Sequence, residues 1–367
     1  MHLLVLFVLG ISVANASITF PLKRAFAKEE SPGLLTRLRD IFSDRLKNKH
    51  DVIYKGTIYV GTPPKAFNVV WDTGSSVFWL PMKGCKSSGP HADACKTNDR
   101  TYDPKESSTS KSSRRSFRLH YGTGHAFGRY YTDSIQFGSL NNKSMKMDRV
   151  SVGAARQIEY IDHGIVGLAL PASKQPKPLF FEAVDRGLMD EPIFTTYMRK
   201  CDGECENGGA ITLGGFDDEH CVKDIHWTPV VSGTSMWRFM VSGMKVGNYS
   251  ASSIQKYGIT DSGTSYIQIP TKLFKNVVAE LKAEQMKGYY VMPCDSKFEM
   301  EFTVNGKTFK VTEKEVLLNQ GYGQKCVVAI GDAGMFDMFL LGDAFVRGWC
   351  QVYDIKEKKV GFAPVKH

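Results

Sequence analysis

Hydrophobic and polar residues alternate along much of the chain from Asp51 onward, with the two-residue period of β-strands. Residues 54–62 (YKGTIYVGT) and 66–74 (AFNVVWDTG) alternate or are continuously apolar, and the Thr-Pro-Pro between them is typical of a hairpin turn. Residues 116–138 predict a second hairpin, because two strand-like arms flank a glycine-rich tip. The pattern therefore predicts an all-β fold.

Only two segments have the spacing of an amphipathic helix. Residues 178–189 and 271–286 place apolar residues at i, i+3 and i+4, and the second segment follows Pro270. One low-complexity stretch, 105–116, is rich in serine and is predicted to be an exposed turn or strand edge. We therefore expect few helices.

The N-terminal residues have the pattern of a secretory signal. An apolar stretch at 3–13 precedes Ala-Asn-Ala, which fits the usual cleavage pattern, so residues 1–16 are predicted to be a signal peptide. No Lys or Arg precedes the apolar stretch, which leaves a buried N-terminal strand as the alternative. No later apolar run is long enough to span a bilayer. We expect a secreted protein, extracellular or in a gut lumen, with a lysosomal location as the alternative.

The length of the chain predicts two lobes, and its composition predicts a globular protein. With 367 residues, the chain exceeds what one hydrophobic core usually fills. Its 42% hydrophobic and 23% charged residues are typical of a globular protein and not of a disordered or fibrous one.

The eight cysteines are an even number, and an oxidising compartment would pair them as disulfides. Pairing neighbours gives Cys85–Cys95, Cys201–Cys205 and Cys294–Cys326, and leaves Cys221 and Cys350. Many other pairings are possible for eight cysteines. The paired close spacings of zinc sites do not occur, so neither a metal nor another cofactor is expected. Asn142 and Asn248 begin Asn-x-Ser triplets and are candidate glycosylation sites.

The formal net charge of +9 is partly concentrated near the N-terminus. Residues 17–50 carry eight Lys and Arg against four Asp and Glu. Such a basic leader could bind nucleic acid or an anionic membrane, and it could equally lie across an acidic groove of its own protein. No nucleic-acid recognition motif accompanies the charge, so nucleic acid is not an expected partner.

A short motif occurs twice in the chain. DTGSS at 72–76 and DSGTS at 261–265 each begin with an Asp. Each is followed much later by a segment with two apolar residues and a glycine, GIVGLA at 164–169 and FLLGDA at 339–344. Two similar halves that each contribute one Asp predict a pseudo-twofold molecule in which the two Asp residues meet.

Two carboxylates in contact cannot both ionise readily, because each negative charge opposes the other. Such a pair holds one proton over a wide acidic range. The ionised Asp can take a proton from water while the protonated Asp donates to a carbonyl oxygen, which is general acid–base hydrolysis of an amide. Asp72 and Asp261 are therefore the candidate catalytic residues, although a single Asp-Thr-Gly is more often only a β-turn.

The residues that follow the two Asp residues suit this chemistry. Gly74 and Gly263 would let the backbone turn tightly and bring its N–H groups near the carboxylates. Hydroxyl groups occur in both motifs and could donate to the carboxylates or fix the loops, and they belong to Thr73, Ser75, Ser262 and Thr264.

Five motifs carry a family resemblance: GTPPKAFNVVWDTGSSVFWLP (61–81), YGTG (121–124), GIVGLA (164–169), ITDSGTS (259–265) and FLLGDAFVRGWCQVYD (339–354). Together they resemble the pepsin-like aspartic peptidases of the cathepsin D, pepsin and renin type. The resemblance covers about residues 51–365. It implies a bilobal fold with two pseudo-symmetric, β-barrel-like lobes, at 51–218 and 219–367, and a β-hairpin flap.

The resemblance also implies roles for single residues. Asp72 and Asp261 would be the catalytic pair, and Tyr121 would be the flap aromatic that closes over the substrate. Trp79 would hydrogen-bond this tyrosine from behind, and Ser75 would lie beside the first Asp. The implied substrate-binding and flap residues are Gly74, Ser75, Trp79, Tyr121, Gly122, Thr123, Gly263 and Thr264.

Two further expectations follow from the resemblance. Residues 17–50 would be an inhibitory propeptide, and the positive charge of this leader leads us to expect Lys47 or Lys49 over the anionic Asp pair at neutral pH. Cys221 and Cys350 match positions of the nematode members, which implies a Cys221–Cys350 bridge within the C-terminal lobe.

The chain departs from the family pattern at three positions. Ser262 stands where many relatives have Thr, and it keeps the hydroxyl group. His125 follows the YGTG motif where a small hydroxylated residue is usual, and His163 stands where Asp is common. These two histidines affect the expected substrate preference and pH optimum, and both are expected to be solvated or hydrogen-bonded side chains.

The sequence therefore predicts a monomeric aspartic endopeptidase, made as a zymogen, with an acidic pH optimum and protein or peptide substrates. Val77, Phe78 and Phe127 lead us to expect hydrophobic residues on both sides of the scissile bond. One alternative is a catalytically inactive binding protein on the same fold, but both Asp residues and the flap tyrosine are intact. Another is a serine hydrolase, but the chain has no Gly-x-Ser-x-Gly motif.

Overall fold

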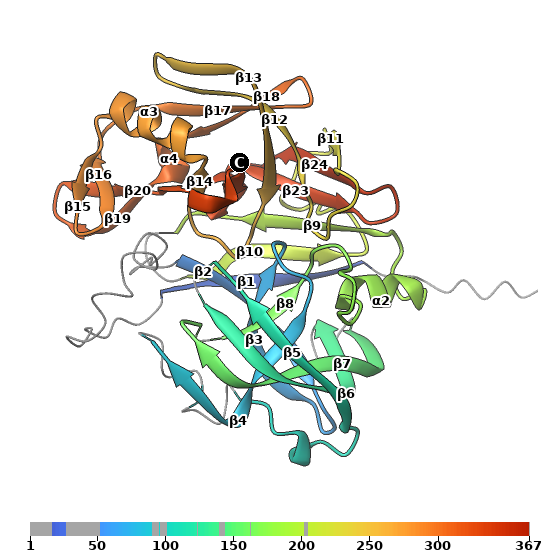
Figure 1. Ribbon diagram of the computed structural model, residues 1–367. Helices are drawn as coiled ribbons and strands as arrows, with labels where there is room; N and C mark the ends of the chain where they lie inside the picture. Colours follow the sequence, from blue (N-terminus) through green and yellow to red (C-terminus); the bar gives the residue numbers. More distant parts are fainter. Residues whose placement is uncertain are drawn as a thin grey trace, which may run out of the picture.

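The computed structural model describes residues 17–26, 52–89, 95, 101–122, 124–138, 144–161, 163–201 and 205–366. The predicted signal peptide, residues 27–50 of the predicted leader and Asp51 lie outside these ranges. The described chain is built mostly of strands, in two lobes one above the other (Figure 1). The all-β, bilobal fold expected from the sequence is confirmed.

The N-terminal lobe, the lower one in Figure 1, contains seven strands between residues 52 and 167. They are β2 (Val52–Val60), β3 (Lys65–Asp72), β4 (Phe78–Ser88), β5 (Lys111–His120), β6 (His125–Gly138), β7 (Ser144–Glu159) and β8 (Gly164–Gly167). A short 3-10 helix η2 (Pro104–Glu106) precedes β5, and helix α2 (Leu179–Asp185) follows β8. β5 and β6 form the predicted second hairpin.

The C-terminal lobe contains a seven-stranded and a four-stranded sheet. The first holds β12 (Phe239–Val246), β13 (Tyr249–Thr260), β14 (Ile267–Ile269), β17 (Glu299–Val304), β18 (Lys307–Thr312), β21 (Ile330–Asp332) and β22 (Phe339–Leu341). The second holds β15 (Glu284–Met286), β16 (Tyr289–Pro293), β19 (Leu317–Tyr322) and β20 (Lys325–Val328). The helices are α3 (Thr271–Leu281), α4 (Glu313–Val316), α5 (Asp343–Val346) and the 3-10 helix η3 (Gly334–Phe336).

One sheet of 13 strands connects the lobes, because its order runs from β11 and β24 at one edge to β6 and β5 at the other. Its middle is formed by β9 (Ile193–Met198), β10 (Cys205–Leu213) and β1 (Ile18–Phe26), which cross between the lobes in Figure 1. Beyond β9 the sheet continues through β23 (Trp349–Asp354) and β24 (Lys359–Pro364) to β11 (His226–Pro229) at its edge.

Strand β1 comes from the predicted leader and lies inside this sheet. It pairs with β10 on one side and with β2 on the other. Ile18, Phe20 and Leu22 alternate with exposed residues and are buried, as a strand with one face on the core requires. Phe20 packs on Trp71 with ring centroids 4.5 Å apart. The first part of the leader is thus integrated into the fold.

The two predicted helices exist but are shorter than the sequence pattern suggested. Helix α2 ends at Asp185, and Gly187 behind it has a positive φ of 67°. Helix α3 ends at Leu281, because Lys282 adopts a left-handed conformation and residues 284–286 pair as β15 with β16. None of the described helices is both long and apolar enough to cross a membrane.

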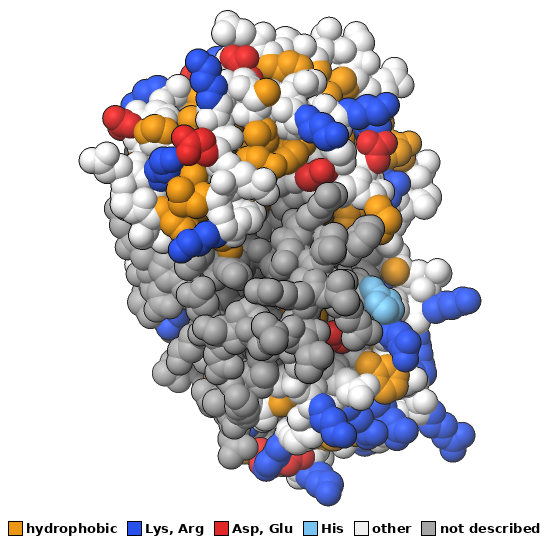
Figure 2. Space-filling model, turned by 60° about the vertical axis from the view of Figure 1, so that its left-hand side comes forward, with side chains coloured by type: hydrophobic (Ala, Val, Ile, Leu, Met, Phe, Trp, Pro, Cys, Tyr) orange, Lys and Arg blue, Asp and Glu red, His pale blue; other side chains and the backbone are white. Residues whose placement is uncertain are grey.

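Basic side chains gather on the lower, N-terminal lobe in Figure 2. The segment that contains most of the β5–β6 hairpin is rich in basic residues, because residues 107–132 include five Lys and Arg and no Asp or Glu. These five are Lys111, Arg114, Arg115, Arg118 and Arg129.

Three of the expected disulfides lie within the described part of the chain. Cys85–Cys95, Cys221–Cys350 and Cys294–Cys326 are all formed, with Cα atoms 5.3, 6.1 and 4.8 Å apart. Cys201 is also disulfide-bonded, but the side chain of Cys205, its expected partner, lies outside the described residues.

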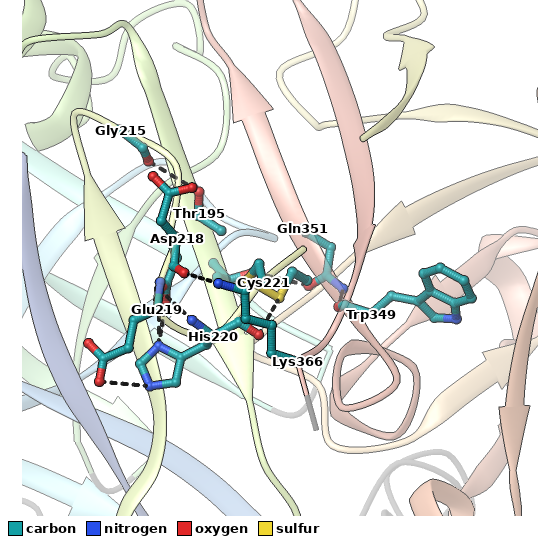
Figure 3. Close-up of a disulfide and its surroundings, with 12 residues drawn as sticks. Thr195, Gly215, Asp218, Glu219, His220, Cys221, Trp349, Gln351 and Lys366 are labelled. Carbon is teal, nitrogen blue, oxygen red and sulfur yellow. Dashed lines mark hydrogen bonds and ion pairs between the residues drawn. A yellow bond between two sulfur atoms is a disulfide. The ribbon is translucent and has the colours of Figure 1, made fainter. Parts of the chain in front are cut away.

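The Cys221–Cys350 bridge holds the segment that leads into the C-terminal lobe against the last strands of the chain. Figure 3 shows this bridge beside His220, Gln351 and Lys366. The backbone N–H of Lys366 donates to the carbonyl of His220 at 2.8 Å, and Cys221 forms a single β-bridge with Val365. The pairing implied by the nematode resemblance is therefore present.

Candidate active site

The two Asp residues occupy equivalent places in the two lobes. Asp72 is the last residue of β3, which pairs in parallel with β8 and places Asp72 opposite Gly167. Asp261 directly follows β13, which pairs in parallel with β22 and places Thr260 opposite Leu341. The downstream segments of the sequence repeat are therefore the strands beside the two Asp residues, as the pseudo-twofold arrangement requires.

The glycine in each downstream segment allows the Asp loop to pack closely on the neighbouring strand. A Cβ atom on Gly167 would lie 2.4 Å from the backbone nitrogen of Val77, and one on Gly342 would lie 2.1 Å from the carbonyl oxygen of Thr264. Such distances are not possible for real side chains. This close packing explains why the chain has glycine after the apolar pair in both halves.

The first Asp loop folds back on its own carboxylate. The N–H of Gly74 donates to Asp72 Oδ1 at 2.8 Å, and the hydroxyl of Ser75 donates to Asp72 Oδ2. Each oxygen thus accepts a hydrogen bond from the loop that follows it, which fixes the plane of the carboxylate.

The second loop repeats this arrangement. The N–H of Gly263 donates to Asp261 Oδ1 at 2.9 Å, and the hydroxyl of Thr264 donates to Asp261 Oδ2 at 2.6 Å. The predicted roles of the glycine and hydroxyl residues in both motifs therefore agree with the observed hydrogen bonds.

Thr73 and Ser262 link the two loops across the boundary between the lobes. The N–H of Thr73 donates to the Ser262 hydroxyl at 3.0 Å, and the N–H of Ser262 donates to the Thr73 hydroxyl at 3.0 Å. The hydroxyls in turn donate to backbone carbonyls of the opposite lobe, Thr73 to Thr260 at 3.0 Å and Ser262 to Trp71 at 2.6 Å. The Ser262 hydroxyl therefore fixes the loops, which is one of the two roles expected for it, and does so by contacts to the opposite lobe.

Each carboxylate lies against the glycine of the opposite loop. A Cβ atom on Gly74 would be 2.6 Å from Asp261 Oδ1, and one on Gly263 would be 2.7 Å from Asp72 Oδ1. Only glycine leaves room for this approach. The two Asp residues are thereby brought together, as the repeat predicted.

The environment of the pair favours retention of a proton. Asp72 is 5% exposed and Asp261 is 8% exposed. Burial raises the pKa of Asp72, and the adjacent negative charge of Asp261 raises it further. The hydrogen bonds from Ser75 and Gly74 oppose this increase without cancelling it. The pair thus combines loss of solvent with mutual repulsion, which are the conditions for sharing a single proton.

Tyr121 lies at the tip of the β5–β6 hairpin and faces the pair. Its hydroxyl accepts a hydrogen bond of 2.7 Å from Trp79 Nε1, and its N–H donates to the carbonyl of Gly124 at 2.7 Å. Burial, followed by the negative charge of Asp72, raises the pKa of the Tyr121 hydroxyl, so it stays protonated. Gly122 lines the same cleft, while Thr123 lies outside the described residues.

A cleft of about 1050 Å³ runs past the Asp pair and is lined by residues of both lobes. Much of its lining is apolar or aromatic, with Ile161 and Ile165 from the N-terminal lobe and Ile259, Phe274, Tyr289 and Met338 from the C-terminal lobe. A cleft of this size that crosses from one lobe to the other suits an extended polymer better than a small molecule.

The residues from which we expected an apolar preference do not line this cleft. Val77 and Phe78 are 3% and 4% exposed and belong to the core, and Phe127 lies on another surface of the β5–β6 hairpin. Alternation showed that these positions were apolar, but it could not show which face of the sheet they occupy. The apolar lining comes partly from the motifs, with Ile165 and Ile259, and partly from segments outside them, with Ile161, Phe274, Tyr289 and Met338.

The two unusual histidines have different surroundings. His125 is paired with Glu159, with 2.6 Å between Nε2 and Oε2. His163 lines the cleft itself. Within the described ranges, no three His, Cys, Asp or Glu side chains are grouped so that they could hold a metal ion.

Two buried carboxylates, each fixed by its own loop and linked across two similar lobes, define the class of aspartic peptidases. Residues 53–365 match the family model of the eukaryotic aspartyl proteases, and the chain belongs to this family. It is an aspartic endopeptidase.

Relatives from nematodes and vertebrates extend over most of the chain. It is 29% identical over 358 residues to Aspartic protease 2 of Necator americanus, which covers 86% of this chain and 83% of the relative. It is 32% identical over 334 residues to Aspartic protease 1 of Caenorhabditis elegans, with coverages of 86% and 83%. Pepsin A of Canis lupus familiaris is 31% identical over 360 residues, with coverages of 93% and 89%.

Proposed function

We propose that this endopeptidase is secreted as a zymogen and cleaves proteins at acidic pH with Asp72 and Asp261 as its catalytic pair. The observation that carries the proposal is the reciprocal contact between each carboxylate and the glycine of the opposite loop. This contact brings two buried carboxylates together in a cleft of about 1050 Å³ that both lobes line.

In the proposed reaction, the pair starts with one proton. The ionised Asp takes a proton from a water molecule as the water oxygen bonds to the peptide carbon, and the protonated Asp gives its proton to the carbonyl oxygen. The resulting gem-diol then returns one hydroxyl proton to the pair, the other Asp protonates the amide nitrogen, and the C–N bond breaks. Both products leave, and the pair again holds one proton.

Tyr121 contributes by closing the cleft. The hydrogen bond from Trp79 holds the tyrosine ring in place over the pair, and the raised pKa of its hydroxyl makes proton transfer by this residue unfavourable. Closure of the hairpin tip would exclude water and fix the substrate backbone. The apolar lining supports a preference for hydrophobic residues on both sides of the scissile bond.

The pH dependence of the mature enzyme tests the shared proton. Because burial and Asp261 raise the pKa of Asp72, the pair keeps its proton at acidic pH and loses it as the pH rises through this raised value. We expect kcat/KM for a peptide to decline above that point by about tenfold per pH unit, since one proton is lost. A statine-type inhibitor should block the cleavage completely. An activity that increases steadily towards alkaline pH, or that resists the inhibitor, would contradict the proposal.

The leader is proposed to inhibit the precursor. At neutral pH, Lys47 or Lys49 would lie over the anionic Asp pair, where opposite charges in a partly buried cleft attract strongly. Acidification would protonate the carboxylates and weaken this attraction. Both lysines lie outside the described residues. β1 supports a two-part leader, because residues 18–26 are hydrogen-bonded in the sheet and would stay in place when the rest is released.

Shifting the secreted precursor from neutral pH to about pH 4, where carboxyl groups become protonated, tests this proposal. We expect activity to appear together with a new N-terminus near residues 46–51, and the precursor itself should begin at Ser17. Full activity at neutral pH with residues 17–50 attached would refute the inhibitory role.

Treatment of the same protein with a glycosidase would show whether Asn248, which is exposed after β12, carries a glycan. Asn142 lies outside the described residues.

A further inference from the structure

The outer face of the β5–β6 hairpin carries a cross-strand row of side chains that the catalytic site does not use. Arg118 of β5 is paired with Phe127 of β6, which is paired with Gln157 of β7, and Gln157 is paired with Lys86 of β4. Directly paired residues on neighbouring strands point to the same face of a sheet. Arg118 and Lys86 therefore flank an aromatic and an amide side chain on one surface.

A second row lies beside the first, towards the tip of the hairpin. His120 is paired with His125, and His125 is paired with Glu159. Glu159 is the only carboxylate among the described residues that line this surface, and it is already engaged by His125. Within the described part of the chain, neither Lys86 nor Arg118 takes part in an ion pair.

The two rows enclose a shallow groove of about 320 Å³. We call it the basic groove and define it by Lys86, Arg118, His120, His125, Phe127 and Glu159. His120 lines both the basic groove and the catalytic cleft. The basic groove and the cleft therefore adjoin at His120.

Phe127 gives the basic groove an apolar contact surface. It is 38% exposed, and the guanidinium carbon of Arg118 lies 5.7 Å from its ring centroid. An exposed ring beneath an arginine leaves an aromatic platform with cationic side chains at its borders. This combination can contact the stems of side chains and bind their carboxylates at the same time.

We propose that the basic groove binds an acidic segment of the polypeptide substrate that extends beyond the catalytic cleft. This inference rests on the proposed function, because only a polymer substrate can occupy both hollows at once. The positive charge of Lys86 and Arg118 selects carboxylates, and Phe127 packs on the aliphatic part of Glu or Asp side chains. Substrates with an acidic segment at the right distance from the scissile bond are therefore bound more tightly than neutral ones.

A charged edge strand has another use, because Lys and Arg on an edge prevent sheets from pairing with one another. β5 is the edge strand of the large sheet, so this effect contributes to its composition. Among the described strands, β4 also pairs only with β7 at Lys86, because its pairing with β8 is confined to Phe78 and Trp79, so edge protection can account for this lysine as well. It does not account for the exposed ring of Phe127 in a hollow between the two cations, and this feature favours a binding surface.

Peptides that share one scissile core test the proposal. The core alone is compared with the same core extended by four Glu or by four Gln, at either end, at low ionic strength and about pH 5.5, where Glu is ionised. For one end or both, we expect the Glu extension to lower KM by about threefold to tenfold relative to Gln, the range for a few exposed ion pairs. The double variant Lys86→Gln/Arg118→Gln should lose this difference and retain kcat/KM for the core.

The double variant Lys245→Gln/Lys272→Gln removes the same charge from the C-terminal lobe and should retain the difference. High salt should reduce it in the wild-type enzyme. Equal KM values for Glu and Gln peptides at both ends, or a difference that survives Lys86→Gln/Arg118→Gln, would overturn the proposal. So would binding of heparin to the basic groove without any preference for acidic peptides.

Binding of a fluorescent Glu-extended peptide can be measured by anisotropy without turnover. This measurement distinguishes failure of the proposed function from failure of the proposed role of the basic groove. If the core peptide is not cleaved by any of the proteins, the proposed function fails. If it is cleaved but the labelled peptide binds wild type and Lys86→Gln/Arg118→Gln equally, the basic groove alone is rejected.

Discussion

Replacing either Asp72 or Asp261 with Asn is expected to lower kcat by about three to four orders of magnitude, the largest effect of any single substitution in this chain. The amide can neither accept the proton of the attacking water nor return one to the peptide nitrogen. Folding should be unaffected or improved, because each substitution removes a buried carboxyl group that faces a second one. Peptide cleavage and thermal unfolding, measured on the same preparations, check both parts of this expectation.

Asp133 offers a matched control, because it is fully buried but lies away from the cleft. Its carboxylate accepts hydrogen bonds from Tyr102 at 2.7 Å, Ser107 at 2.8 Å and Thr109 at 2.6 Å. Asp133→Asn places an N–H₂ group against hydroxyl donors and should cost about 1–3 kcal/mol of stability. Its kcat should remain close to that of the wild type. A catalytic Asn variant with near-wild-type kcat would show that the pair does not carry the reaction.

Gly263→Ala is expected to lower kcat/KM by about 100-fold, although the change adds only one methyl group. That methyl group would lie 2.7 Å from Asp72 Oδ1 and must push the carboxylate of the opposite lobe away from Asp261. Misplacement of a catalytic group by about 1 Å is enough for a loss of this size. The pH profile of the residual activity should also change, because separation of the two carboxylates weakens the repulsion that raises the pKa of Asp72.

Tyr121→Ala provides the comparison for this variant. It should lower kcat/KM by about one to three orders of magnitude through loss of closure, but it leaves the Asp pair in place and should preserve the pH profile. A normal kcat/KM for Gly263→Ala would mean that the two loops can separate without loss of function. The close contact between them would then not be the basis of catalysis.

The meeting of Asp72 and Asp261 could be predicted from the sequence because the repeat is short, similar in its chemistry and accompanied by a second repeated segment. Asp72 and Asp261 are far apart in sequence, yet the similar halves placed them together. The hydroxyls of Thr73 and Ser262 were recognised as loop-fixing groups, but their exchange of hydrogen bonds across the lobes could not be predicted. That exchange depends on how the lobes dock, which no local pattern specifies.

Other features were missed although a local signal existed. Ile18, Phe20 and Leu22 alternate with polar residues in the manner of a half-buried strand, but the basic composition of residues 17–50 favoured a detached leader. Helix α3 was predicted to be too long, because apolar spacing continues beyond Leu281 whereas the backbone turns at Lys282. Pairing with the distant strands β2 and β10 decided the first outcome, and pairing of β15 with the next strand, β16, decided the second.

The pairing of strand β1 determines how many polypeptides the cleaved enzyme contains. Its residues pair with Leu213 and its neighbours on β10 and with Lys55 and its neighbours on β2, so both its edges are hydrogen-bonded. A cut between β1 and β2 would therefore not by itself separate the pieces. The product would be a complex of two polypeptides, in which a short peptide supports Trp71 beneath the catalytic loop as a non-covalent subunit. Loss of that peptide would leave a slot in the sheet that only another strand, such as the newly formed N-terminus, could fill.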